Sequence, residues 1–227
     1  MVLDKGNYLE YGFIPTVEDW NIFLENWNTE IFENLNAKFI EQYSYEFSEV
    51  LENECCLWEG ATEDDISKLE ERLRTKLPLG YKNFLLASNG FTILNRYCEL
   101  YGTDQIKWFI EENKEWVEIW NGDEDRIDED WAEIWGIDSD EDDIDEDDIS
   151  DEEYIQYGDD PLLTRSQYMK TALQISSTRD GDVFLLNPII KDARNEWEAW
   201  DFGNKNPGAF RYHSFWDMMQ ELYKQKF

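Results

Sequence analysis

The residue types that enzymes most often use for catalysis are scarce or poorly placed in this chain. Its one histidine, His213, directly precedes Ser214, whose hydroxyl is spaced to cap a helix, so a turn position is favoured over the role of a general base. The sequence contains no phosphate-binding glycine loop, zinc-ligand spacing, nucleophile elbow or cysteine–histidine arrangement. Pairs of carboxylates are so abundant that they indicate nothing. We therefore predict a protein that is not an enzyme and needs no cofactor.

The chemistry that the sequence does offer is negative charge. Acidic residues number 53 against 20 basic ones, and the formal net charge is -33. Residues 121–160 hold 21 of the acidic residues and only one basic residue, Arg126. A field of this sign repels nucleic acids and anionic lipid headgroups, and it accelerates encounters with basic proteins. We therefore expect a basic protein partner, and neither a nucleic acid nor a membrane.

The most acidic stretch, residues 138–153, has two interpretations. It is either a solvated, disordered loop that keeps the protein soluble, or a mimic of a phosphate backbone that presents carboxylates to a nucleic-acid-binding surface. A calcium loop is not favoured, because Asp143 stands where an EF-hand needs glycine and Ile149 where it needs a bidentate glutamate. We predict no dedicated metal site. The candidate partner-binding carboxylates are Asp140, Asp142, Asp143, Asp147 and Asp148.

Two tryptophans, Trp131 and Trp135, lie four residues apart inside the acidic region. They are either core residues or contact residues for a basic partner, since tryptophan is enriched at interface hot spots and faces Lys or Arg through cation–π contacts. Both alternatives stay open, and both residues are candidate partner-binding residues.

The segment before residue 58 has the pattern of an amphipathic helix. Thr16 precedes the acidic first-turn residues Glu18 and Asp19. Apolar residues then recur mostly at intervals of three and four: Trp20, Phe23, Leu24, Trp27, Ile31, Leu35 and Phe39. Such a stripe covers a core more often than it recruits a partner.

Residues 57–91 predict two helices joined by a turn. Thr62 and Asp65 have the spacing of a capping box at the start of the first helix. Pro78 ends that unit and opens the second helix, because the residue before a proline leaves the helical conformation. Asn89 and Gly90 tolerate the left-handed conformation and are predicted to close the second helix.

The rest of the chain predicts strands, one further helix and a closing helix. Two short strands are expected around an Asn95-Arg96 turn, and a helix over residues 104–120. Residues 173–176 and 183–186 flank a hairpin-like turn at residues 179–182. Residues 196–200 alternate as a strand, with Trp197 and Trp200 predicted on one face. Ser214 and Asp217 are predicted to cap the last helix.

Two blocks of residues occur in an order that points to a known family. The first block contains Trp58, Ile66, Leu69, Glu70, Leu73, Leu77, Pro78, Tyr81, Phe84, Leu85, Asn89 and Gly90. The second contains residues 173–175, 181–188, 197–200 and 214–215. Together they resemble the SUKH superfamily, which has a Smi/Knr-like domain and includes the yeast cell-wall-synthesis regulator and many bacterial immunity proteins.

The resemblance and the patterns together predict an α+β fold. We expect a single SUKH-like domain with a sheet packed on helices over residues 58–227, interrupted by a long acidic insertion at residues 121–160. An N-terminal helical arm over residues 1–57 precedes it. Without a charged-then-apolar leader or a bilayer-length apolar run, a cytoplasmic location is expected. The thiols of Cys55, Cys56 and Cys98 are expected to be reduced.

The function that the resemblance implies is that of an immunity protein. Such a protein binds and neutralises a cognate toxin by stoichiometric occlusion, and the acidity suits a basic toxin domain, for example a nuclease. The alternative is a non-enzymatic regulatory scaffold that resembles the yeast cell-wall-synthesis regulator.

Overall fold

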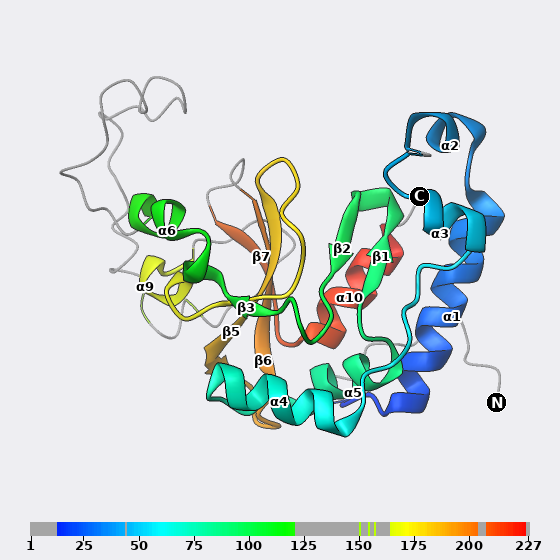
Figure 1. Cartoon of the computed structure of the whole chain (residues 1–227). Coiled ribbons are helices and arrows are strands. Elements are labelled where there is room, and N and C mark those ends of the chain that lie inside the picture. Colours follow the sequence, from blue (N-terminus) through cyan, green and yellow to red (C-terminus); the bar gives the residue numbers. More distant parts are fainter. Residues whose placement is uncertain are drawn as a thin grey trace, which may run out of the picture.

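A five-stranded antiparallel sheet lies between two layers of helices (Figure 1). The computed structural model describes residues 13–43, 45–120, 150, 154, 157, 164–203 and 208–225. The strands run in the order β3 (Lys107–Trp108), β4 (Leu173–Gln174), β5 (Asp182–Lys191), β6 (Trp197–Gly203) and β7 (Ala209–Tyr212). Every neighbouring pair is antiparallel. The predicted α+β fold with a sheet packed on helices is confirmed.

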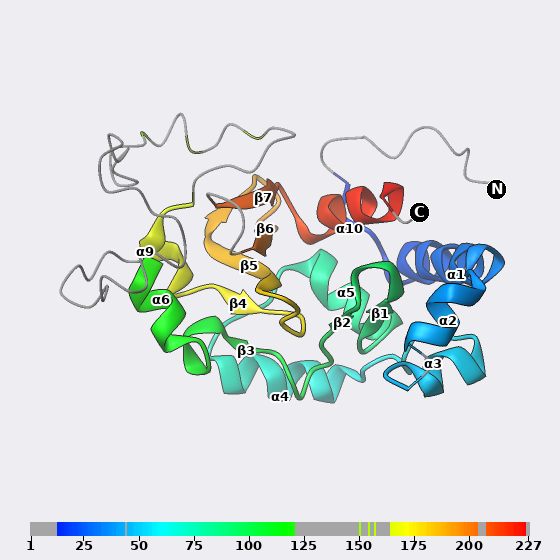
Figure 2. The same ribbon diagram turned by 90° about the horizontal axis from the view of Figure 1, so that it is seen from above.

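Helices cover both faces of this sheet (Figure 2). The larger layer contains α1 (Val17–Asn34), α4 (Glu63–Leu73), α5 (Leu79–Ala87) and α10 (Phe215–Lys224). The smaller layer contains α6 (Lys114–Trp120) and α9 (Ser166–Met169). Two separate hydrophobic clusters result, one on each face of the sheet.

Strand β6 contributes alternately to the two clusters. Trp197 and Ala199 belong to the cluster of the larger layer, whereas Trp200 and Phe202 belong to the other one. The prediction that both tryptophans share one face is therefore wrong. Side chains of a strand alternate with a period of two, so residues three positions apart point to opposite faces.

The predicted pair of helices is confirmed. The Thr62 hydroxyl accepts a hydrogen bond from the Asp65 amide (3.2 Å) and the Asp65 carboxylate accepts one from the Thr62 amide (3.0 Å), which starts α4 with a capping box. Arg74 ends α4 in the left-handed conformation, and Pro78 precedes α5. The prediction that α5 ends in a left-handed conformation is wrong, because the C-cap residue of this helix, Ser88, has an extended backbone.

Gly90 instead serves the entry into the next strand. Its φ of +129° is a conformation that residues with a side chain rarely adopt. A Cβ atom there would lie 2.5 Å from Cε3 of Trp58, so the indole packs directly on the glycine backbone. Glycine is required for both reasons.

Helix α1 packs within the larger core, which confirms the core alternative for its stripe. The buried residues are Trp20, Phe23, Leu24, Trp27 and Ile31. The Trp20 indole N–H donates to the Gly80 carbonyl at 2.9 Å, so α1 is joined directly to the start of α5.

The predicted stripe does not continue unbroken to Phe39. Leu35 is extended, and the Asn36 side chain accepts the Phe39 amide at 2.9 Å to start a new helix, α2 (Ala37–Tyr43). Helix α3 (Ser48–Asn53) follows. The Asn36 cap starts a separate helix, although the helical spacing of apolar residues continues through Leu35 and Phe39. The division of the chain at residues 57 and 58 stays a prediction.

The segment after Gly90 forms a second, two-stranded sheet. Strands β1 (Phe91–Ile93) and β2 (Cys98–Leu100) flank the 3₁₀ turn η1 (Leu94–Arg96), as predicted. The Tyr101 amide donates to the Ile175 carbonyl at 2.8 Å, which joins this hairpin to the chain directly after β4.

A continuous helix over residues 104–120 was a wrong prediction. Residues 107–108 pair with β4, η2 (Phe109–Glu111) follows, and only α6 is α-helical. The Asn113 side-chain amide donates hydrogen bonds to the Phe109 backbone carbonyl and to the Gln174 side chain. The backbone carbonyl of Asn113 accepts a hydrogen bond from the Val117 amide at the start of α6. Pairing with a strand far away in the sequence overrides the local helical spacing.

The C-terminal elements agree with the sequence except at one strand. Asp180 and Gly181 both have positive φ in the β4–β5 turn, as a tight hairpin requires. The Ser214 hydroxyl accepts the Asp217 amide at the start of α10. Strand β7 was not predicted.

The packing of Trp58 on Gly90 predicts a large effect of a single methyl group. Gly90→Ala is expected to lower the free energy of unfolding by about 3 kcal/mol, since backbone strain and a steric clash add. In a Trp58→Leu background the same substitution is expected to cost about 1–2 kcal/mol, because only the strain remains. Urea unfolding of the four proteins measures both values, and equal costs in the two backgrounds would contradict the clash.

Candidate functional site

The predicted partner-binding residues lie outside the described part of the chain. These are Trp131, Trp135, Asp140, Asp142, Asp143, Asp147 and Asp148. Their role stays a prediction. The described residues offer three other features: the family-motif helices, a buried ionic cluster and a surface pocket.

The apolar family-motif residues form the core between α4 and α5. Leu69, Leu73, Leu77, Tyr81, Phe84 and Leu85 are all buried in the larger cluster. Asn89 has a different role, because its side chain accepts the Thr103 amide at 2.8 Å and thereby holds the chain that follows β2. These residues position elements of the fold.

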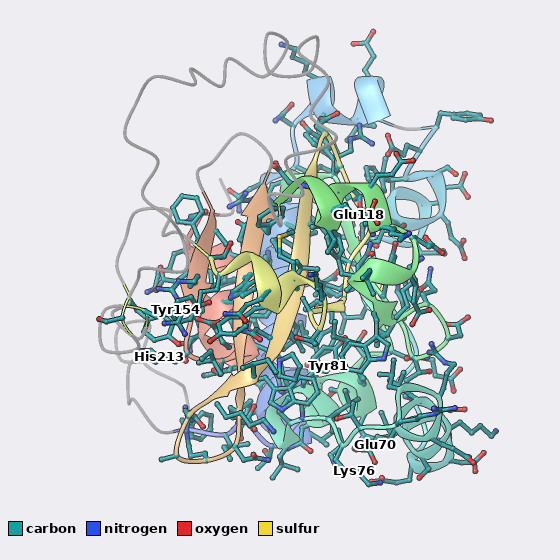
Figure 3. The ribbon with its side chains drawn as sticks, turned by 90° about the vertical axis from the view of Figure 1, so that its left-hand side faces the viewer. Glu70, Lys76, Tyr81, Glu118, Tyr154 and His213 are labelled. Atoms are coloured by element: carbon teal, nitrogen blue, oxygen red, sulfur yellow. The ribbon has the colours of Figure 1, made fainter. Side chains whose placement is uncertain are left out.

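Glu70 is the charged residue of the motif, and it holds the turn between the two helices. Its carboxylate accepts the Leu77 amide at 3.1 Å and contacts Lys76 at 2.5 Å and Lys82 at 3.5 Å (Figure 3). Burial raises the pKa of this carboxyl, but the Lys76 and Leu77 hydrogen bonds and the charge of Lys82 outweigh it and leave the pKa below its usual value.

A second carboxylate joins this turn to the sheet. Glu196, which directly precedes β6, is 2% exposed and accepts the Gly80 amide at 3.0 Å. A Cβ atom on Gly80 would lie 2.7 Å from Oε2 of Glu196, so glycine allows the close approach. The first turn of α5 thus receives a negative charge where its free N–H groups point.

A buried ionic cluster around Glu198 lies on the sheet face that the smaller helix layer covers. One oxygen of this carboxylate, Oε2, accepts hydrogen bonds from Trp200 (2.8 Å), Asn187 (2.9 Å) and Tyr154 (3.2 Å). The other, Oε1, lies 3.3 Å from Nη1 of Arg211. The side chains of Glu198 and Arg211 are 0% and 2% exposed. Burial raises the pKa of Glu198, and Arg211 and the hydrogen bonds oppose this.

Tyr154 connects this cluster to the end of the acidic stretch. Its ring lies under the Arg211 guanidinium, 3.8 Å from the centroid, and its carbonyl accepts Nη2 of Arg211 at 2.6 Å. Tyr154 is 1% exposed, and Figure 3 shows it on the β7 side of the sheet with His213. His213 lies in the predicted turn position, and its ring contacts Tyr157 at a centroid distance of 3.8 Å with the ring planes tilted by 41°. The cluster therefore fixes the chain one residue after the acidic run 138–153.

The third feature is a pocket of about 210 Å³ between the turns of two hairpins. Figure 1 shows the β1–β2 turn and the β4–β5 turn at the same end of the molecule. Arg96 and Tyr97 come from the first turn, Arg179 and Asp182 from the second, and Asp201 from β6. Binding residues commonly lie on loops that a rigid scaffold holds in place.

The charges of the pocket are unevenly compensated. Asp201 is 6% exposed, and Nη1 of Arg96 lies 3.4 Å from its Oδ2. Burial raises the pKa of Asp201 to about 6; Arg96 lowers it and the negative charge of Asp182 raises it further. Arg179 pairs with Glu46, which precedes α3, and lies over the Tyr97 ring.

The described lining of the pocket does not favour nucleophilic chemistry. Cys98 lines it, but burial raises the pKa of this thiol to about 11, so the reactive thiolate is absent near neutral pH. Among the residues that the structure describes, no group of three histidine, cysteine, aspartate or glutamate side chains could hold a metal ion.

Both pocket turns are predictable from the sequence, but their meeting in space is not. Arg96 and Asp201 are more than one hundred positions apart, and each appears in the sequence as an ordinary turn or strand residue. The one sequence feature that marks both turns is an arginine in each of them, in a chain that is poor in basic residues.

The fold and its motif residues define a SUKH-type α+β domain. The chain belongs to the SMI1/KNR4 family (SUKH-1), whose model matches residues 60–221. This confirms the resemblance found in the sequence. A search of curated proteins found no match. None of the helices in the described part of the chain is both long and apolar enough to cross a membrane.

The buried cluster predicts an asymmetric response to mutation. Arg211→Met leaves Glu198 buried without its counter-charge and is expected to cost about 3 kcal/mol or more in unfolding free energy. The matched control is Lys68→Met, which breaks an exposed ion pair with Asp64 and is expected to cost less than about 1 kcal/mol.

The cost of Arg211→Met is also expected to depend on pH. The folded-state pKa of Glu198 is raised, so the folded state binds this proton more tightly than the unfolded chain does. The penalty is therefore full above the raised pKa and shrinks as the pH falls through it. Urea titrations between about pH 5 and pH 8 test this, and a penalty equal to that of Lys68→Met at every pH would disprove the role of the cluster.

Proposed function

We propose that this protein is an immunity protein that binds a cognate basic polymorphic toxin and neutralises it by stoichiometric occlusion. The observation that carries the proposal is membership of the SUKH-1 family. The superfamily that the sequence resembles includes many bacterial immunity proteins. The net charge of -33 supports it, because a toxin that acts on an anionic substrate such as a nucleic acid has a basic surface.

Occlusion requires no catalytic group in the immunity protein. In this proposal the carboxylates of residues 121–160 attract the toxin, and Trp131 and Trp135 make desolvated contacts with it. The toxin loses access to its substrate while the complex lasts. Enzymatic turnover plays no part.

The experiment uses the toxin domain encoded next to this gene in its own genome. Co-expression is expected to restore the growth of cells that produce the toxin, and the purified proteins are expected to form a complex of fixed stoichiometry by light scattering. Inhibition of the toxin should be complete at that molar ratio. Sub-stoichiometric protection would indicate turnover instead. An isolated gene in a fungal genome would favour the scaffold alternative.

Two sets of variants separate attraction from retention. Replacing Asp140, Asp142, Asp143, Asp147 and Asp148 by Asn or Ser is expected to slow association and to flatten its salt dependence, while dissociation changes less. Alanine at Trp131 and Trp135 is expected to speed dissociation, with a loss of about 2 kcal/mol or more in binding free energy. Stopped-flow kinetics at several salt concentrations measures both. If neither set changes the rates, the contact lies on the family domain itself.

A further inference from the structure

The pocket between the two hairpin turns keeps an excess of negative charge after its arginines are accounted for. Arg179 is paired with Glu46, and Arg96 contacts Asp201 and donates to the side chain of Gln225 at 2.7 Å. The exposed carboxylate of Asp182 makes no ion pair within the described part of the chain. Both guanidinium groups therefore have acceptors already, which disfavours an anionic ligand.

The two aspartates lie on the same face of the sheet. Asp182 is directly opposite Gly203 and Asp201 is directly opposite Phe184, so the two side chains are diagonal neighbours across β5 and β6. Asp201 is buried at the base, whereas Asp182 is exposed. The one ionic contact of Asp201 in the described residues is long, at 3.4 Å, and the raised pKa of this buried carboxyl is consistent with partial compensation. A second cation would complete the compensation.

The size and lining of the pocket suit a single long side chain. Its volume of about 210 Å³ is below the roughly 300–1,000 Å³ of small-molecule sites. The Tyr97 and Phe184 rings line it together with the carboxylates. Lysine and arginine combine an apolar stem with a charged end, which matches a pocket lined by both rings and carboxylates.

We propose that this pocket receives one lysine or arginine side chain of the basic partner, with its charged group between Asp182 and Asp201. This proposal rests on the proposed function, because it assigns the toxin contact to a defined place on the family domain. The acidic stretch attracts many positive charges, whereas the pocket selects one of them by shape.

The pocket is tested first without any toxin. N-acetyl-arginine amide and N-acetyl-lysine amide are titrated into the full-length, isotope-labelled protein at low salt, and backbone amide shifts are followed by NMR. Saturable shifts are expected at Asn95, Arg179, Asp182 and Asp201. The neutral analogue N-acetyl-citrulline amide is expected not to bind. Asp182→Asn is expected to weaken binding about fivefold, and the exposed control Asp64→Asn is expected to leave it unchanged.

Several results would overturn the proposal. These are shifts spread over the acidic surface without saturation at the pocket, equal binding of the citrulline analogue, or pocket shifts caused by inorganic phosphate in place of the cations. Asp182 is exposed at the end of β5, so its amide variant is expected to fold, and its thermal unfolding provides the check.

The toxin complex then distinguishes this proposal from the proposed function. If the pocket is used, Asp182→Asn is expected to speed dissociation of the toxin about fivefold while Asp64→Asn does not. A stable toxin complex that is insensitive to Asp182→Asn refutes the pocket and leaves the immunity function intact. Cation binding in the pocket without any toxin neutralisation refutes the immunity function, and with it the pocket as a toxin contact.

Discussion

Strand β6 is buried along its whole length. Two buried acidic residues, Glu198 and Asp201, lie in it and a third, Glu196, directly precedes it, so each of the three carboxylates needs a partner in the interior. A buried carboxylate without compensation is costly, so its surroundings are strongly constrained. Glu196 points to the start of α5, Glu198 to Arg211 and Tyr154, and Asp201 to Arg96. One strand thus fixes the family helices, the end of the acidic stretch and the base of the pocket.

The three carboxylates differ in how completely they are compensated. Glu198 accepts three hydrogen bonds and faces an arginine, which suits a purely structural role. Glu196 accepts a backbone amide of α5. Asp201 has one long ionic contact in the described residues and lies at the base of the pocket. Of the three, Asp201 is the carboxylate that lines a surface pocket, and a perturbed carboxyl in a cleft marks a candidate functional site.

Features that depend on neighbouring residues were predictable from the sequence. The Thr62–Asp65 and Ser214–Asp217 caps and the Asp180–Gly181 turn follow from local hydrogen bonding and backbone geometry. Errors arose where distant pairing decided the structure. Residues 107–108 became a strand because β4 lies beside them, and the pocket forms where Arg96 of the β1–β2 turn meets Asp201 of β6. No local pattern encodes these contacts.

The charge of the chain and the fold of the domain have different consequences for binding. Between exposed charges, attraction is screened over about 8 Å at physiological ionic strength, so the acidic field accelerates encounter but holds a partner weakly. Specific retention requires desolvated contacts on an ordered surface. In the described residues the pocket that we propose for such a contact lies where the β1–β2 and β4–β5 turns meet, and the Tyr101–Ile175 hydrogen bond joins the first hairpin to the chain after β4. A partner selected by charge alone would be any basic protein, whereas a partner selected at this pocket must present one cation at a defined position.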